Sequence, residues 1–399
     1  MDKNLSHMVS PLKLPQRILL GPGPSNVSPR VLSALSLPVV GHLDPEFFKV
    51  MEDNKKMLRW IFQTENELTF PVSGTGSAGM ETCLVNLMEE GDGVLVCVNG
   101  VFGTRMADIV ERYGGKLIRV EAPWGEIIQP EQVENALKNN QVKIICLVHA
   151  ETSTGVWQPV EEISKIVHNH EALLVLDTVT SLGGCPVQLD KWQVDASYSG
   201  TQKCLSCPPG LSPVSFSRAA QEKIKNRDSK VKSWYLDTTM IARYWGEERV
   251  YHHTAPVSMN YALHEALALI TEEGLEARFK RHRLNHMALM AGLSAMGIEF
   301  AAQEGHRLWM LNSVRVPNGV KDAEVRKRLL QDFSIEIGGG LGPLAGKTWR
   351  IGLMGESSKQ EHVLTLIRRL SQILPDYGLK VSGEEAKAAA QKIYAEIKN

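Results

Sequence analysis

The chain has 399 residues, of which 43% are hydrophobic and 22% are charged. This composition is that of a globular protein and excludes a disordered, collagen-like or coiled-coil chain, while the length favours two or three domains. The 44 lysines and arginines nearly balance the 45 acidic residues, for a net charge of -1. That balance argues against nucleic acid or an anionic membrane surface as the main partner, because both attract a concentrated positive field.

The sequence also bears on location. No apolar run approaches the roughly 18 residues that a membrane-spanning helix needs. Residues 1–16 lack the apolar core of a secretory signal and the arginine-rich pattern of a transit peptide, and residues 397–399 are not a peroxisomal signal. The six cysteines are scattered between positions 83 and 207, which is typical of reduced thiols. We therefore expect a soluble cytoplasmic protein without disulfides or membrane contact.

The first two thirds of the chain alternate short β-rich runs with segments of helical period, which is typical of a mostly parallel sheet covered by helices. Apolar residues from Met80 to Met88 recur at helical spacing, and Gly91 is expected to end that helix. The predicted strands number seven and lie at residues 68–72, 94–98, 117–121, 143–149, 173–177, 196–199 and 213–216. The sequence thus predicts an α/β domain.

After about residue 251 the pattern changes. One long helical stretch is expected from Met259 into the basic run 278–283, of which residues 280–283 are interpreted as a solvated helix face. Shorter elements follow at residues 313–316, 323–333, 335–337, 349–353 and 362–374, with a terminal helix over 384–397. We predict an N-terminal arm (1–21), a large α/β domain (22–278) and a smaller α+β domain (279–399).

The segment 73–79, SGTGSAG, follows a predicted strand and opens a helix, and it contains GxGxxG. A dinucleotide site would also need an acidic residue about 20 positions further on, at the end of the next strand. That strand instead ends in Asn99 and Gly100. Two interpretations remain: a phosphate site, because free N–H groups at a helix N-terminus attract anions, or a plain tight turn.

Asp177 and Lys203 follow two consecutive predicted strands. Asp177 alone is ambiguous, since a strand-end carboxylate also serves as a helix cap or, beside a GxxxxGK[ST] loop that this chain lacks, as a Mg²⁺ ligand. A lysine buried at such a position has a lowered pKa, the condition for forming a Schiff base. A phosphate cradle, a carboxylate for a pyridinium N–H and a Schiff-base lysine together describe a pyridoxal phosphate (PLP) site.

With these residues in place, the chain resembles the class V aminotransferases of PLP fold type I, specifically their alanine:glyoxylate / serine:pyruvate group. The resemblance runs in order through nearly the whole chain. Its segments are LGPGPSN (20–26), SGTGSAG (73–79), ETSTG (151–155), DTV (177–179), GTQK (200–203), YHHT (251–254), GGGLG (338–342) and WRIG (349–352). It implies a large domain with a mostly parallel seven-stranded sheet and a smaller α+β C-terminal domain.

The resemblance also implies roles for individual residues. Lys203 would bind the cofactor as a Schiff base and then move the substrate proton, and Asp177 would keep the ring nitrogen protonated. Arg350 would grip the substrate carboxylate, with Gly23 near the substrate. The remaining cofactor contacts would be Gly76, Ser77 and Gln202 at the phosphate, Phe102 stacked on the ring, Thr152 near its O3′, Val179 on the opposite face, and Tyr251 and Thr254 at the phosphate of the neighbouring subunit of a homodimer.

Two positions depart from the animal members of the group, which have tryptophan in place of Phe102 and histidine in place of Ser77. Phenylalanine still stacks but lacks the indole N–H, and serine removes a large contact. We therefore expect a different affinity for the cofactor.

The expected reaction transfers an amino group from alanine to glyoxylate and gives pyruvate and glycine. One identified carboxylate-binding arginine, Arg350, favours monocarboxylic substrates, because a second buried carboxylate would need its own partner. Serine as the donor, with pyruvate or glyoxylate as acceptor, is the alternative. A cysteine desulfurase is less favoured because all cysteines precede position 208. No metal is expected, since Cys204 and Cys207 form a lone CxxC and His252 and His253 lack ligand spacing.

Overall fold

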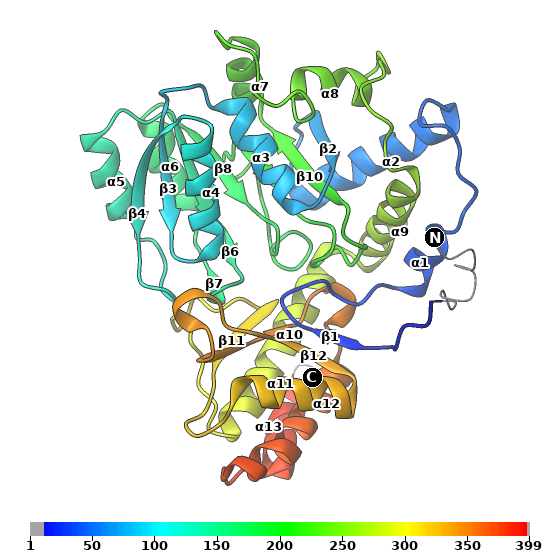
Figure 1. Ribbon diagram of the computed structural model, residues 1–399, viewed down its shortest axis with the longest axis vertical. Helices are drawn as coiled ribbons and strands as arrows, with labels where there is room; N and C mark the ends of the chain where they lie inside the picture. Colours follow the sequence, from blue (N-terminus) through cyan, green and yellow to red (C-terminus); the bar gives the residue numbers. More distant parts are fainter. Residues whose placement is uncertain (1–11, 397–399) are drawn as a thin grey trace, which may run out of the picture.

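The computed structural model describes residues 12–396. A seven-stranded sheet forms the first part of the molecule, with strand order β2-β10-β9-β8-β5-β3-β4 (Figure 1). Only β10 runs antiparallel to its neighbours. The strands are β2 (Leu68–Ser73), β3 (Gly93–Val98), β4 (Lys116–Glu121), β5 (Ile144–Val148), β8 (Leu173–Asp177), β9 (Ala196–Tyr198) and β10 (Leu211–Phe216). The mostly parallel seven-stranded sheet of the α/β prediction is confirmed.

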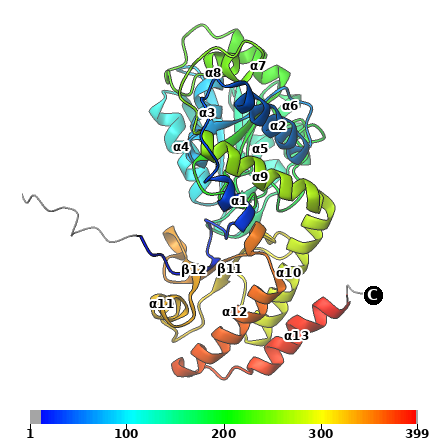
Figure 2. The same cartoon turned by 90° about the vertical axis from the view of Figure 1, so that its right-hand side faces the viewer.

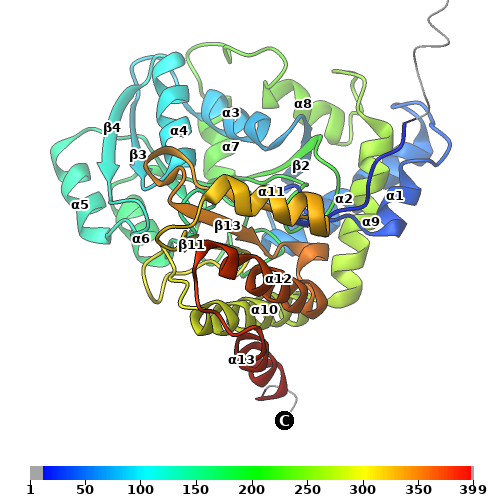
Figure 3. The ribbon, with the colours of Figure 1, turned by 60° about the horizontal axis from the view of Figure 1, so that its bottom comes forward.

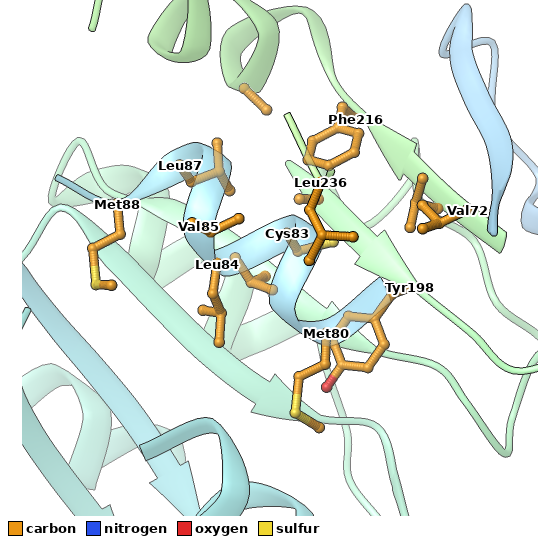
Figure 4. Close-up of a cluster of buried hydrophobic side chains, with 14 of the residues drawn as sticks. Val72, Met80, Cys83, Leu84, Val85, Leu87, Met88, Tyr198, Phe216 and Leu236 are labelled. Carbon is orange, nitrogen blue, oxygen red and sulfur yellow. The ribbon is translucent and has the colours of Figure 1, made fainter. Parts of the chain in front are cut away.

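Side chains from the two faces of this sheet pack into two different hydrophobic cores. In β3, Val94, Val96 and Val98 face one core, and Leu95 and Cys97 face the other. The alternation follows from the period of two along a strand, and every residue of β3 is buried because helices cover both faces. Figure 4 shows the first core, where α3 (Gly76–Leu87) packs on the sheet beside Tyr198 and Phe216.

Helices α4 (Val101–Arg112) and α8 (Thr238–Trp245) contribute to the same core as α3. Helices α5 (Pro130–Asn139), α6 (Glu161–Asn169) and α9 (Val257–Glu273) contribute to the second core. The predicted end of α3 at Gly91 is wrong: the helix stops at Leu87, and the extended Met88 leads into a turn. Helices α1 (Pro29–Ala34), α2 (Pro45–Phe62) and α7 (Arg218–Lys225) complete this part.

A small hairpin follows β5 and was absent from the sequence prediction. It pairs β6 (Ala150–Glu151) with β7 (Val156–Trp157) in antiparallel fashion. The ETSTG segment forms its turn and follows the carboxyl end of β5.

The second sheet has four strands in the order β1-β12-β13-β11. Strand β1 (Ile18–Leu20) comes from the N-terminal arm and pairs in parallel with β12 (Ile335–Gly339). Strands β13 (Thr348–Gly352) and β11 (Leu311–Arg315) continue the sheet antiparallel. Helices α10 (Leu275–Ala295), α11 (Asp322–Phe333), α12 (Gln360–Ile373) and α13 (Gly383–Glu396) gather on this part and share its core (Figure 3).

The long helical stretch predicted from Met259 is two helices, because the chain breaks at Gly274 between α9 and α10. Helix α10 then continues into the second part (Figure 2). The predicted division at residues 278 and 279 thus falls within the first turn of α10, and the predicted arm supplies β1. Residues 1–11 and the predicted helix end at position 397 lie outside the described residues. Across residues 12–396, no helix has the length and apolar character to cross a bilayer.

Candidate active site

Residues singled out in the sequence meet at the carboxyl edge of the large sheet. Asp177 ends β8, and Lys203 follows β9. Gly76 opens α3 shortly after β2, Phe102 lies in the first turn of α4 after β3, and Thr152 is buried in the β6–β7 turn. Open α/β sheets bind ligands at this edge, where the strand ends and helix N-termini converge.

Lys203 is enclosed at this edge. Its Nζ donates a hydrogen bond to the Pro22 carbonyl. Burial, with a smaller contribution from the positive charge of Arg350, lowers the pKa of the Lys203 ammonium from 10.5 to about 8. A Cβ on Gly23 would lie 2.6 Å from Lys203 Nζ, so the N-terminal segment passes the lysine at a distance that only glycine permits.

Asp177 is buried at the end of β8. Its Oδ2 accepts a hydrogen bond of 2.7 Å from the Tyr198 hydroxyl, and its Oδ1 accepts one of 2.8 Å from the Val179 N–H. Burial raises the pKa of the Asp177 carboxyl to about 6, although both hydrogen bonds oppose the rise. The carboxyl is therefore mostly ionised at pH 7, a buried anion suited to a cationic ring N–H.

A small cradle lies between α3 and the loop before Lys203. A Cβ on Gly76 would lie 3.5 Å from a Val179 methyl and 3.7 Å from Gly200 Cα. The first N–H groups of α3 have no intrahelical partner and carry the positive end of the helix dipole. Close by, the buried Oε1 of Gln202 has no hydrogen-bond partner among the described residues. These features fit a phosphate.

Ser77, Phe102 and Arg105 form a side wall of the site. Arg105 Nη1 donates a hydrogen bond of 3.1 Å to Ser77 Oγ, and its guanidinium lies 5.1 Å from the centre of the Phe102 ring. Arg105 also adds to the positive field at Lys203. The sequence analysis missed Arg105, and its place one helical turn after Phe102 is the signal that could have found it.

Arg350 reaches the site from β13 in the second sheet. Its Nε donates a hydrogen bond of 2.7 Å to the Gly339 carbonyl of β12. The guanidinium is buried, which lowers its pKa, and it is close enough to Lys203 to shift the lysine pKa. The second part of the molecule thus supplies a desolvated cation beside the lysine.

Tyr251 and Thr254 are exposed in the single chain, on the segment between α8 and α9. Their neighbour His253 bonds through Nε2 to Ser73 Oγ at 2.7 Å, so this segment lies beside the end of β2. Two further site residues had no assigned role in the sequence, namely Tyr198, the partner of Asp177, and Glu151, a buried carboxylate between Phe102 and Ser153. No sequence pattern marks either residue, because β6 has only two residues and β9 reads Ala-Ser-Tyr.

The chain was compared with known proteins. A model of the class-V aminotransferases matches residues 22–354. The chain is 42% identical over 368 residues to the alanine–glyoxylate aminotransferase of Rattus norvegicus (91% of this chain, 89% of the rat protein). It is 38% identical over 398 residues to the (S)-ureidoglycine–glyoxylate transaminase of Bacillus subtilis (95% and 96%). The crystal structure of an alanine–glyoxylate aminotransferase from Nostoc sp. superposes with a TM-score of 0.92 at 47% identity (94% and 100%).

The fold and these similarities define a PLP-dependent enzyme of fold type I. The chain belongs to the class-V aminotransferase family and is a transaminase. When bound, PLP supplies an aldehyde that takes up an amino group and a ring that accepts carbanion charge. The residues present fit this group: the Gln202 Oε1 without a partner and the α3 N-terminus would hold its phosphate, Asp177 its ring nitrogen and Lys203 its aldehyde carbon.

We expect the rate at which the cofactor-free enzyme takes up PLP to rise with pH and to level off above about pH 8. Only an uncharged amine attacks an aldehyde, and the pKa of Lys203 is lowered to about 8. Stopped-flow absorbance between about pH 6 and about pH 10 measures this rate. The control is a lysine amide whose α-amino group is acetylated, because its side-chain pKa of about 10.4 keeps its rate rising over the whole range. A protein profile that follows the free amine would contradict the lowered pKa.

Proposed function

We propose that this enzyme transfers the amino group of alanine to glyoxylate, producing pyruvate and glycine. The observation that carries the proposal is Arg350, a buried arginine whose positive charge acts on Lys203. A guanidinium binds one carboxylate in bidentate fashion, and a monocarboxylic amino acid needs no second cation. Several relatives are named alanine–glyoxylate aminotransferase, which agrees with this donor and acceptor.

The acceptor is better supported than the donor. Glyoxylate appears in the names of both kinds of relative, alanine–glyoxylate and ureidoglycine–glyoxylate, at similar identity. (S)-Ureidoglycine is therefore the second candidate donor, and serine, with glyoxylate or pyruvate as acceptor, is the third. Each carries one carboxylate for Arg350, so the donors differ only in how their remaining atoms fit the pocket.

In the proposed reaction, three residues divide the work. Arg350 holds the substrate carboxylate and so fixes the orientation of Cα. Lys203, whose amine is partly uncharged near neutral pH because of its lowered pKa, would accept the Cα proton and deliver it to the cofactor carbon on the other side of the nitrogen. Asp177, as a buried anion, would hold the ring nitrogen of PLP and stabilise its positive charge.

A cysteine desulfurase is not favoured. Its nucleophile is a thiolate, whereas all six cysteines of this chain are free and buried. Burial raises the pKa of both Cys97 and Cys204 to about 12, which keeps them protonated. Because free thiols are typical of the cytosol, we also propose a cytoplasmic location.

We further propose that the enzyme works as a homodimer in which Tyr251 and Thr254 reach the cofactor phosphate of the partner subunit. Both are exposed here, and they lie among other exposed apolar side chains, including Trp234 (62% exposed), Tyr235 and Val250. Contacts of His252 with Trp234 and of His253 with Tyr235 join these side chains into one patch. An apolar patch of this kind is typical of a protein interface.

The absorption spectrum of the PLP-loaded enzyme tests the reaction. Alanine is expected to remove the visible band of the lysine-bound cofactor, and glyoxylate added afterwards is expected to restore it. A band that responds to (S)-ureidoglycine or serine but not to alanine would move the assignment to that donor. A band unchanged by all three donors would contradict transamination of small amino acids. Repeating the titration with Arg350→Lys should raise the donor concentration for half-conversion about tenfold or more, because the bidentate contact is lost.

A further inference from the structure

Glu151 is a fully buried carboxylate that the proposed reaction does not use. It ends β6 at the carboxyl edge of the sheet, and none of the ion pairs among residues 12–396 includes it. Instead, Oε1 accepts hydrogen bonds from the N–H (3.0 Å) and the Oγ (2.6 Å) of Ser153, and Oε2 accepts one of 3.0 Å from the Phe102 N–H. A buried carboxylate is costly unless such donors surround it.

Together, Glu151 and Ser153 cap the N-terminus of α4. Ser153 Oγ accepts a hydrogen bond of 3.0 Å from the Val101 N–H, while Glu151 takes the N–H of Phe102, the next residue. These are the first two N–H groups of the helix, which lack intrahelical partners. The N-cap, Gly100, has no side chain to bind them, and a Cβ there would overlap Glu151 and Ser153. The cap therefore comes from the β6–β7 hairpin.

This cap determines where Phe102 lies. Its backbone N–H is held by Glu151, and its side chain projects from the first turn of α4, where one turn later Arg105 lies over the ring. The carboxylate of Glu151, on strand β6, thus holds the turn of α4 that carries the ring. Glu151 also acts on the site by charge, because it raises the pKa of Asp177 and opposes the effect of burial on Arg350.

We propose that Glu151 is a positioning residue for the cofactor: by holding the first turn of α4, it sets the Phe102 ring at the height and tilt at which it stacks on the pyridine ring. This inference rests on the proposed role of Phe102 as the stacking residue. It assigns to Glu151 a function in cofactor binding rather than only in stability.

A double-mutant cycle tests it. The variants are Glu151→Gln, which keeps the shape but loses the charge and one acceptor, Phe102→Ala, and the pair. The readouts are the PLP dissociation constant of the cofactor-free enzyme and the circular dichroism of the bound cofactor, which reports ring orientation. Glu151→Gln is expected to raise the dissociation constant about tenfold and to change the dichroism, because hydrogen bonds to a charged group are lost. In the Phe102→Ala background, the same change should have little further effect.

A matched pair of serines separates positioning from helix capping. Ser217 caps α7 at the opposite edge of the sheet as Ser153 caps α4: its Oγ accepts from Ala220 N–H (3.1 Å) and donates to buried Asp195 (2.9 Å). Ser153→Ala is expected to raise the PLP dissociation constant about threefold, whereas Ser217→Ala should lower the melting temperature without changing PLP affinity. This pair also decides the question if Glu151→Gln does not fold.

Multiplicative effects of Glu151→Gln and Phe102→Ala, an unchanged PLP affinity in Glu151→Gln, or equal effects of the two serine variants would each overturn the inference. An unchanged affinity in Phe102→Ala would overturn it too, because no stacking residue would then need positioning. Failure of the proposed function is distinguished by the substrates: the binding cycle contains no amino acid or oxo acid, so an incorrect donor leaves its result intact.

Discussion

Replacing Lys203 by methionine is expected to abolish transamination and at the same time to stabilise the cofactor-free protein. The activity is expected to fall at least about 10³-fold, because the variant removes the amine that accepts the Cα proton in the proposed reaction. The stability rises because burial holds the pKa of Lys203 at about 8 in the folded state, against 10.5 when exposed. At about 1.4 kcal/mol for each pKa unit, the folded state is destabilised by about 3 kcal/mol at pH 7.

The pH dependence of this gain has a definite sign. The cost of burying Lys203 is complete below about pH 8, where the ammonium is charged in both states. It shrinks as the pH rises from about 8 to 10.5 and is absent above 10.5, where the amine is neutral in both states. Urea unfolding of the cofactor-free Lys203→Met and parent proteins at several pH values measures it. Lys191→Met is the control. Lys191 is 63% exposed and contacts only Glu161, which is also exposed, and Gln188 among the described residues, so its loss should leave activity and stability nearly unchanged. A Lys203→Met protein that retains activity would refute the assignment of Lys203.

Arg278→Met is expected to lower the free energy of unfolding by about 3 to 5 kcal/mol. Arg278, in the first turn of α10, is buried and donates to the carbonyls of Gly183 (2.8 Å) and Cys204 (2.5 Å) and to Glu273 (2.6 Å). Methionine leaves two buried carbonyls without this donor. Cys204 directly follows Lys203, so the loop that carries Lys203, here called the lysine loop, loses a hydrogen bond from α10. We therefore expect kcat to fall as well.

Denaturant unfolding and steady-state kinetics of the PLP-loaded enzyme measure the two effects. Arg283→Met, on the same helix, is the control: Arg283 is exposed and lies 5.9 Å from the ring of Trp309, a contact worth about 0.5 to 1 kcal/mol. Equal losses in both variants would show that Arg278 has no special role in joining α10 to the lysine loop.

The sequence by itself determined the large sheet and the placing of Asp177 and Lys203. Seven apolar runs bounded by turns predicted seven strands, because strands covered on both faces read as nearly continuous apolar segments. Since parallel strands end at one edge, residues that follow different strands meet there even when they are far apart in the chain. The roles assigned to Phe102, Gln202 and Arg350 came from resemblance to a family rather than from any pattern of spacing.

Only the tertiary structure decided features that depend on contacts between distant segments. Strand β1 has three residues, too few for a periodic signal, and exists because it pairs with β12. The basic run on α10 was expected to be a solvated face; Lys280 and Arg283 are exposed, but His282 is buried and Arg281 donates to the carbonyls of Gly355 and Ser358.

The same reason applies to the polar residues behind the site. A buried carboxylate such as Glu151 looks like any surface glutamate until the donors that satisfy it are known. One of these donors, the Phe102 N–H, comes from α4, about fifty residues earlier in the chain. Periodicity reports which face of one element is apolar, whereas the partners of a buried polar group are fixed by how several elements pack together. The sequence therefore placed the residues at the ends of the strands, and the packing of α4, α10 and the hairpin decided which neighbours hold them there.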